Sequence, residues 1–204
     1  MAPSDVRNHS QKPANTGVEM IRDSLDAVPD YAVPEGFSVR NFRPGDEESW
    51  IAIHQNADEL LDVTRATFDE AFGYDAEALK DRCFFLVAPD GHDVGTGTAW
   101  YCTRRGLPYG RVHWICMVKE YQGRGLAKPL LSTVMKRLAR SHDRGFLDTS
   151  TGRIPAIGLY LKFGFVPIID SHEAAEAWRY VATRLSHPAL EHIRFESGNT
   201  SAKP

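Results

Sequence analysis

The segment Arg111–Arg140 constrains the fold of this chain most, because it reads without a gap as a strand, a glycine-containing turn and a helix. The turn, Gln122-Gly123-Arg124-Gly125-Leu126-Ala127, carries two glycines, which can adopt positive φ and let backbone approach a ligand closely. A helix start adds unpaired N–H groups and the positive end of a dipole. The segment therefore predicts a site for a phosphate group, with Arg124 adding charge.

The helix after this turn has a single apolar face. Its apolar residues follow helical spacing at Ala127, Leu130, Leu131, Val134 and Leu138. Pro129 has no N–H and is tolerated only in the first turn, so the helix should begin no earlier than about Gly125. That start would leave the amides from Gly123 to Leu126 available to a ligand.

Two motifs in this order resemble the GNAT acyltransferase superfamily. Met117–Ala127, MVKEYQGRGLA, is similar to the family signature Gln/Arg-x-x-Gly-x-Gly/Ala. Ala156–Phe165, AIGLYLKFGF, resembles the later block Ala-x-x-Leu-Tyr-x-x-x-Gly-Phe. The first motif alone is weak, but two in the right order with a strand between them are specific. The resemblance covers Phe37 to Ile169 in layout and these two blocks in detail.

The resemblance implies a fold, a cofactor and a set of site residues. The fold would be α+β, an α/β/α sandwich whose mixed, mostly antiparallel sheet has splayed central strands flanked by helices. The turn would grip the diphosphate of acetyl-CoA, the acyl donor, and Tyr160 would protonate the leaving thiolate. The cofactor contacts implied are Met117, Val118, Gln122, Gly123, Arg124, Gly125, Leu126, Ala127 and Lys128.

The chemistry of thioester attack can be matched to particular groups. Splayed strands would leave backbone groups of Cys116–Val118 unpaired, so pantetheine could bond to them and an N–H near Met117 could hold the carbonyl oxygen. A phenol with a pKa near 10 that protonates a thiolate of about 8.5 works against only about 2 kcal/mol. Tyr160 is therefore the expected acid, although a core aromatic with its hydroxyl at the edge is the simpler interpretation of the residue alone.

The general base is less well defined by the sequence. His113 alternates with Ile115 and Met117 on one face of the predicted central strand, and histidine titrates in the useful range. Glu120 is the rival, and strand histidines are mostly structural. Arg153 stands where the family often has asparagine, so one cofactor contact is either missing or remade by the guanidinium.

These residues favour an enzyme that transfers acetyl from acetyl-CoA to a primary amine by direct attack in a ternary complex. The acceptor would be a small-molecule or peptide amine, and a homodimer is one possible assembly. The alternative is a catalytically silent acyl-CoA-binding sensor or interaction module. A nucleotide-binding protein is disfavoured, because no third glycine and no Gly-Lys-Ser/Thr follow Gly123 and Gly125.

Composition limits the other classes. The 204 residues are 42% hydrophobic and 25% charged, with net charge −3 and pI about 6.2, which favours neither nucleic acid nor an anionic membrane as partner. No apolar run approaches the roughly 18 residues of a membrane span, and the N-terminus does not read as a signal peptide, so a cytoplasmic location is expected. No metal site is expected, and Cys83, Cys102 and Cys116 are expected to be reduced and buried, with Cys116 as an alternative nucleophile.

The chain divides into an arm, a domain and a tail. Residues 1–34 are expected to be flexible, with a possible short helix at Gly17–Ala27, residues 35–186 form the domain, and residues 187–204 a disordered tail. Strands are expected at Phe37–Phe42, Cys83–Ala88, Val94–Tyr101, Arg111–Val118, Gly145–Thr149 and Phe165–Ile169. Helical stretches are expected after Asp46, at Asp58–Gly73, Gly125–His142, Ile154–Phe163 and His172–Leu185, and a loop at Arg104–Gly110.

Overall fold

The computed structural model describes residues 15–57, 62–73 and 75–191, and within them seven strands form one sheet in the order β2-β3-β4-β5-β6-β1-β7. The strands are β1 Gly17–Arg22, β2 Ser38–Asn41, β3 Cys83–Val87, β4 Asp93–Arg104, β5 Leu107–Met117, β6 Gly145–Ser150 and β7 Val166–Pro167. The helices are α1 Glu47–Ala57, α2 Arg65–Phe72, α3 Ala76–Arg82, the 3₁₀ turn η1 Lys119–Tyr121, α4 Ala127–Ala139, α5 Ile154–Lys162, α6 His172–Ala182 and α7 Pro188–Glu191.

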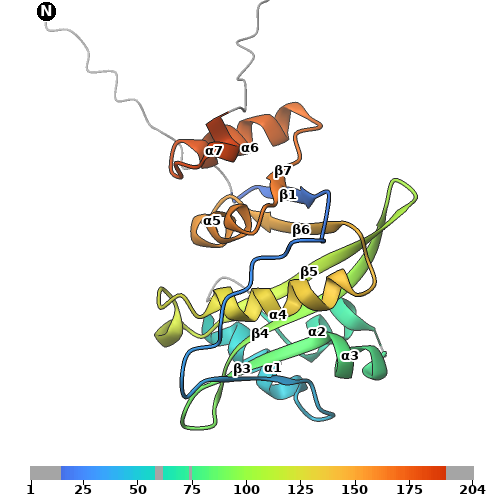
Figure 1. Ribbon diagram of the computed structural model, residues 1–204, viewed down its shortest axis with the longest axis vertical. Helices are drawn as coiled ribbons and strands as arrows, with labels where there is room; N and C mark the ends of the chain where they lie inside the picture. The colour runs from blue at the N-terminus through green and yellow to red at the C-terminus, as the bar shows by residue number, and fades with distance from the viewer. Residues whose placement is uncertain (1–14, 58–61, 74, 192–204) are drawn as a thin grey trace, which may run out of the picture.

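The sheet is antiparallel except at one point. Strands β2, β3, β4 and β5 are neighbours in chain order and pair antiparallel. Short turns join β3 to β4 and β4 to β5, and strands joined this way are antiparallel. Strand β6 pairs parallel to β5 after the α4 crossover, and β1 pairs antiparallel to both β6 and β7. In Figure 1, α4 lies in front of the central strands and α1, α2 and α3 lie behind them. The expected α/β/α sandwich with a mostly antiparallel sheet is confirmed.

Each face of the sheet has its own apolar core. The α4 face is filled by the predicted helix stripe, in which Leu130, Leu131, Val134 and Leu138 are fully buried. The opposite face is dominated by aromatic residues from α1, α2 and the strands, including Trp50, Phe68, Phe72, Phe85 and Trp100. Aromatic side chains each bury a large area, so few of them are needed to hold the three short helices on this face.

The prediction of a mobile arm with a helix at Gly17–Ala27 is wrong where the structure can test it. Residues 17–22 form β1, which pairs along its whole length with β6 and briefly with β7. Val18 and Met20 are buried while Glu19 between them points outward, the two-residue alternation of a half-buried strand. The Arg22 side chain donates to the backbone carbonyl of Phe163, which ties β1 to the end of α5. Residues 1–14 lie outside the described residues.

Three other boundaries differ from expectation. The predicted loop Arg104–Gly110 is a two-residue hairpin turn, because Arg105 and Gly106 adopt φ of 50° and 76° and the flanking residues continue β4 and β5. Helix α3 was not expected; its first turn is capped by the Asp75 carboxylate, which accepts from the Ala78 N–H at 2.9 Å. The tail begins with a helical turn, α7, whose Leu190 is buried, and residues 192–204 lie outside the described residues.

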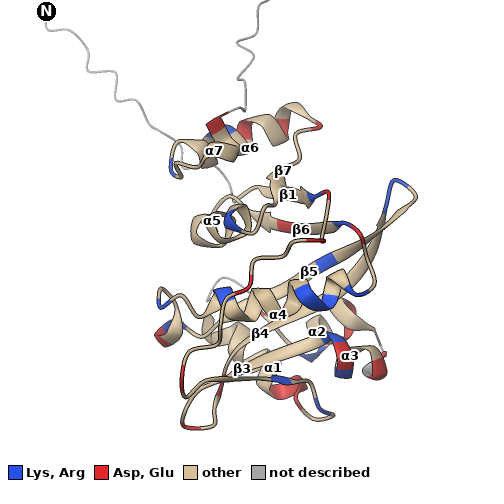
Figure 2. Cartoon of the chain, in the orientation of Figure 1, with Lys and Arg blue, Asp and Glu red and all other residues tan. Residues whose placement is uncertain are grey.

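Charges of both signs occur together on the surface elements. Figure 2 shows Lys or Arg beside Asp or Glu on α3, where Lys80 and Glu77 pair at 2.5 Å. Across the described part of the chain, no helix is both long and apolar enough to cross a membrane.

Candidate active site

The glycine turn joins the end of β5 to the start of α4. Gly123 and Gly125 adopt φ of 72° and 79°, as predicted, and a methyl group built on either would meet no atom within 4 Å. Glycine is therefore needed at both positions because it adopts positive φ easily, and not because a larger side chain would clash with its neighbours. Helix α4 begins at Ala127, and its N-cap residue Leu126 makes no capping hydrogen bond through its side chain.

The amides of this turn are available to a ligand. Among the described residues, none accepts a hydrogen bond from the N–H groups of Gly123 through Ala127. The Lys128 N–H is different, because it donates to the carbonyl of Gly125 at 3.1 Å. Arg124 is exposed, with its guanidinium 4.8 Å from the centre of the Tyr121 ring. Five N–H groups at the positive end of α4 and one cation make a site that suits an anion.

Gln122 has a role that the sequence did not indicate. Its side-chain Nε2 donates to the carbonyl oxygen of Met117 at 2.9 Å. The bond closes the loop between the last residue of β5 and the turn, so the position of the turn is coupled to the position of the strand end.

The splay between the central strands is present. Strands β5 and β6 pair only at Gly110 with Gly145 and Arg111 with Phe146. Strand β5 then continues to Met117 without pairing to β6, so its far half presents one edge to the space between the strands. Next to the last pair, the Arg111 side chain donates to Asp148 of β6 at 2.5 and 3.0 Å, which fixes where the two strands diverge.

The unpaired backbone groups are fewer than predicted for Cys116–Val118. The Val118 N–H donates to Val94 at 3.0 Å, and the Val118 carbonyl accepts from Tyr121, so the prediction is wrong for Val118. Cys116 is paired with Thr96 of β4. Because an antiparallel ladder alternates, the register turns both backbone groups of Met117 away from β4. The Met117 N–H therefore faces the opened edge, while the Met117 carbonyl is held by Gln122.

A β-bulge interrupts β5 at this point. The register with β4 shifts between Thr96 and Thr98, so Gly97 lies opposite both Trp114 and Ile115. Trp114 adopts φ of 51°, a left-handed conformation rare for a bulky residue. A methyl group on Gly97 would lie 2.3 Å from Cδ1 of Ile115, which explains why β4 carries glycine here.

The bulge places His113 on the face opposite to the one predicted. The sequence interpretation set His113 with Ile115 and Met117, but the extra residue resets the alternation. Ile115 and Met117 belong to the α4-side core, whereas the His113 ring lies 5.6 Å from that of Phe72 on α2. Burial lowers the pKa of His113 to about 3, despite a hydrogen bond with the backbone of Ala71. A ring with this pKa is a poor proton acceptor at neutral pH.

Tyr160 on α5 is buried, with 7% of its surface exposed. Burial raises the pKa of its phenol well above the usual 10. The positive charge of Arg153 lowers this pKa, whereas Cys116 and Asp148 raise it further. The groups that influence its pKa come from β5, β6 and the start of α5. The phenol is therefore protonated at all ordinary pH values.

Arg153 supplies positive charge between α1 and α5. It is the N-cap residue of α5, and its charge lowers the pKa of both His54 and Tyr160. His54 is 4% exposed, as its position among apolar residues of α1 predicts, and burial lowers its pKa to about 3. Arg153 thus acts on groups from both sides of the splay, a role that the sequence did not reveal.

An aromatic cluster with unpaired nitrogens lies on the α1 side of the bulge. The rings of Trp50, His54 and Trp114 lie 4.2 to 5.1 Å apart, centre to centre. Within the described residues, Nε1 of both tryptophans and Nε2 of His54 are buried without a hydrogen-bond partner. Burying one such group without a partner costs about 1 to 3 kcal/mol of stability. The cluster therefore favours a ligand or a water that offers oxygen or nitrogen atoms.

The three cysteines form no disulfide and have different environments. Cys83 is fully buried, and burial raises its pKa to about 11, which suits a structural role. Cys102 and Cys116 are half-buried, so the expectation that all three are buried is wrong for these two. Burial raises the pKa of Cys102 as well.

The splayed sheet, the glycine turn and the start of α4 together match the arrangement that the resemblance to the GNAT superfamily predicts. Residues 47–165 match the model of the acetyltransferase (GNAT) family, which is more than half of the chain. The chain belongs to the GNAT acetyltransferase family.

Two relatives with similar sequences are named mycothiol acetyltransferase. A mycothiol acetyltransferase from an Arthrobacter species is 32% identical over 151 residues, and one from Pseudarthrobacter chlorophenolicus is 33% identical over 151 residues. Both alignments cover 68% of this chain and 45% of the relative. The chain therefore spans about half the length of these curated relatives.

Solved structures agree on the fold. A GCN5-related N-acetyltransferase from Sphaerobacter thermophilus has a TM-score of 0.61 at 24% identity, covering 74% of this chain and 48% of that one. A chain from the NatC complex bound to Gag peptide and CoA has a TM-score of 0.54 at 17% identity, covering 65% of this chain and 86% of that one.

Proposed function

We propose that this chain transfers an acetyl group from acetyl-CoA to a primary amine, by direct attack of the amine on the thioester in a ternary complex. The observation that carries the proposal is the row of unpartnered amides from Gly123 to Ala127 beside the opened edge of β5. Family membership supports acetyl-CoA as the donor.

The donor would bind through backbone groups. The Gly123–Ala127 amides suit the diphosphate, because several N–H dipoles lie together at the start of α4, and Arg124 and Lys128 of the same segment would add positive charge. Acetyl-CoA supplies the activated acyl group when bound. The Met117 N–H faces the gap between β5 and β6, where it would hold the thioester oxygen as negative charge develops.

Tyr160 would donate the proton that the leaving thiolate needs. Its hydroxyl is held protonated by burial, and the nearby charge of Arg153 favours the phenolate that results from transfer. His113 is a weaker candidate for the base than its sequence position indicated, because burial lowers the pKa of its ring to about 3. A water bonded to the unpaired nitrogens of Trp50 or His54 could carry the amine proton instead.

The acceptor would enter from the α1 and α2 side of the bulge, against the Trp50, His54 and Trp114 cluster. The mycothiol acetyltransferase relatives support a small-molecule amine, and the fold also occurs in the peptide-bound NatC complex. Asp69 of α2 is paired with Arg65 at 2.9 Å, so its charge is already balanced by a neighbour on the same helix.

The test is a thiol-release assay with acetyl-CoA and a panel of primary amines, run with wild type and Tyr160→Phe. The proposal expects turnover in wild type and a kcat about 100-fold lower in the variant, with acetyl-CoA affinity unchanged. Binding of acetyl-CoA without turnover of any amine would favour the silent binding module. Absence of acetyl-CoA binding would reject both.

A further inference from the structure

The linker between β1 and β2, residues 23–37, crosses the outer surface of α4 and is called the strap here. Figure 1 shows it running from the β1 end of the sheet across α4 to β2. The Tyr31 N–H donates to the Ser132 hydroxyl at 3.1 Å, and that hydroxyl donates to the Pro29 carbonyl at 2.8 Å. Asp30 pairs with Lys136 at 2.6 Å. The strap is thus fixed to α4 at Tyr31 and at the two residues before it.

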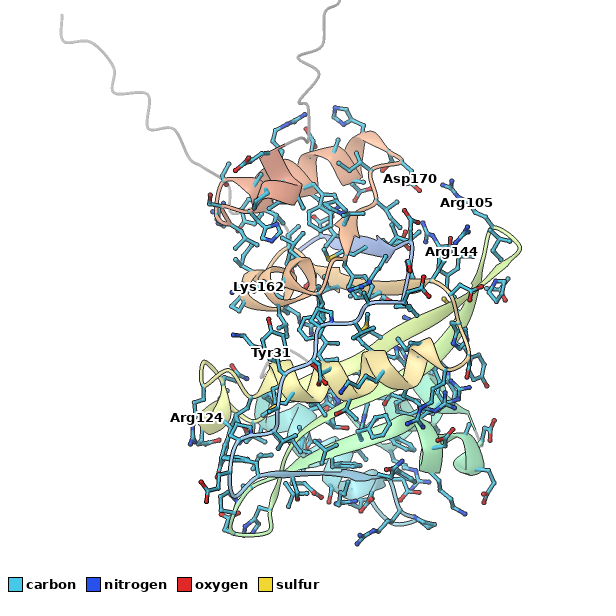
Figure 3. The ribbon with its side chains drawn as sticks, viewed as in Figure 1. Tyr31, Arg105, Arg124, Arg144, Lys162 and Asp170 are labelled. Atoms are coloured by element: carbon cyan, nitrogen blue, oxygen red, sulfur yellow. The ribbon has the colours of Figure 1, made fainter. Side chains whose placement is uncertain are left out.

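Tyr31 is placed at the junction of α4 and α5. Its ring centre lies 5.6 Å from that of Phe163, and the Lys128 ammonium lies 5.3 Å from the Tyr31 ring centre. The residue is 37% exposed, one of the few large apolar side chains with an open surface. Figure 3 shows Tyr31 between α4 and α5, with Lys162 and Arg124 on the same side of the molecule. An aromatic face and several cations therefore meet beside the first turn of α4.

The covalent order of acetyl-CoA decides what would lie there. Its diphosphate joins the acyl-carrying arm to a phosphorylated adenosine. If the Gly123–Ala127 amides hold the diphosphate and the arm runs inward to Met117, the adenosine must leave the turn outward. Lys128 follows the turn directly, so the ring beneath its ammonium is an aromatic surface within reach of that outward path.

The other aromatic ring at the turn is less suited to the role. Tyr121 lies under the Arg124 guanidinium, but it is half-buried in the α4-side core and packs edge-on against Phe37 at 6.1 Å. A base can stack only on an accessible ring face. Of the two rings, Tyr31 is the more exposed.

We propose that Tyr31, carried by the strap, is the platform on which the adenine of acetyl-CoA stacks, with Lys128 and Lys162 attracting the phosphate groups around it. The inference rests on the proposed function. It assigns a cofactor-binding task to a segment that the sequence suggested was a flexible arm. Stacking of this kind needs only a flat aromatic face, so phenylalanine would replace tyrosine and alanine would not.

The experiment measures the dissociation constants of acetyl-CoA and of S-acetyl-4′-phosphopantetheine by calorimetry or by competition. The second thioester lacks the phosphorylated adenosine and one phosphate of the diphosphate, so each variant is compared with wild type on the same ligand. Tyr31→Ala should weaken acetyl-CoA binding about tenfold and leave the truncated thioester within twofold of wild type. Tyr31→Phe should bind both ligands like wild type, which also shows that the strap is intact. Tyr180→Ala removes a comparable cation-covered ring on α6, under Arg184 at 3.7 Å, and should change neither affinity.

Each other outcome overturns the inference. Unchanged acetyl-CoA affinity in Tyr31→Ala would show that the ring is not used. Equal weakening of both thioesters would show that the substitution distorts the turn instead. A loss confined to Tyr121→Ala would move the platform to the other ring. Wild type that binds neither thioester would reject the proposed function itself, a result distinct from the other three.

Discussion

Gln122 and Met117 are joined by a hydrogen bond of 2.9 Å from the side-chain amide of the first to the backbone carbonyl of the second. Met117 is the last residue of β5, and Gln122 opens the glycine turn. The bond holds the strand end, where the thioester would be attacked, at a fixed distance from the amides that would hold the diphosphate. Cofactor binding and catalysis would share this one contact.

Replacing Gln122 with leucine should therefore affect both stability and cofactor binding. The Met117 carbonyl would lose its donor, at a cost of about 1 to 2 kcal/mol in the free energy of unfolding, and the acetyl-CoA dissociation constant should rise at least fivefold. Urea unfolding and calorimetry measure the two effects. Gln55→Leu is the matched control, because Gln55 makes the same kind of bond to the Val63 carbonyl at 2.7 Å. Equal changes in affinity for the two variants would argue against the coupling.

Gly95→Ala tests the packing of the Met117 side chain. A methyl group on Gly95 would lie 2.3 Å from the Met117 sulfur and 3.1 Å from the Cys116 carbonyl oxygen, so both must shift. We expect a loss of about 1 to 3 kcal/mol in stability and a fall in kcat, because the end of β5 moves. Gly17→Ala on β1 is the control, since its new methyl would approach only the Thr149 carbonyl, at 4.0 Å. Unchanged turnover in Gly95→Ala would contradict the placement of the thioester at Met117.

The sequence predicted the parts of this site that depend on local order and not those that depend on register. Positive φ at Gly123 and Gly125 and the start of α4 follow from glycine, proline and helical spacing within one segment. The bulge at Trp114 cannot be read that way, because it exists only in the pairing of β5 with Gly97. The error in the face assigned to His113 has the same origin: alternation holds only while the strand is regular.

The N-terminal strand was missed for a related reason. Its partners β6 and β7 lie far along the chain, so nothing near Gly17–Arg22 signals that the segment is paired. The sequence does show the alternation of Val18, Glu19 and Met20, but over three residues only. The polar residues before it favoured a flexible segment instead. Tyr31 was placed in the arm on the same grounds, although its backbone is bound to Ser132.

Stability should fall on acidification because two buried histidines resist protonation. Burial lowers the pKa of His54 and His113 to about 3, below the ordinary 6.5 that they regain on unfolding. Below pH 6.5 the unfolded chain binds protons that the folded chain does not, so stability is full above this pH and is lost toward pH 3. Each histidine should lower the free energy of unfolding by roughly 2 kcal/mol between pH 6.5 and pH 5.

His54→Phe isolates one of the two contributions. The free energy of unfolding of this variant, measured in urea at pH 7, 6 and 5, should fall less steeply with decreasing pH than that of wild type. The two slopes should differ by about 1.4 kcal/mol per pH unit at most. His92→Gln changes an exposed histidine, with 80% of its side chain accessible, and should keep the wild-type slope. Parallel slopes for His54→Phe and wild type would mean that His54 is protonated in the folded protein.

The most direct measurement of the central claim is the amide spectrum of the ¹⁵N-labelled chain during titration with acetyl-CoA. We predict saturable shifts at Gly123, Arg124, Gly125, Leu126 and Ala127, with the Gly123 and Gly125 amides moving downfield as they donate to the diphosphate, together with a shift at Met117 N–H. Shifts that saturate elsewhere while these amides stay unchanged would contradict the account.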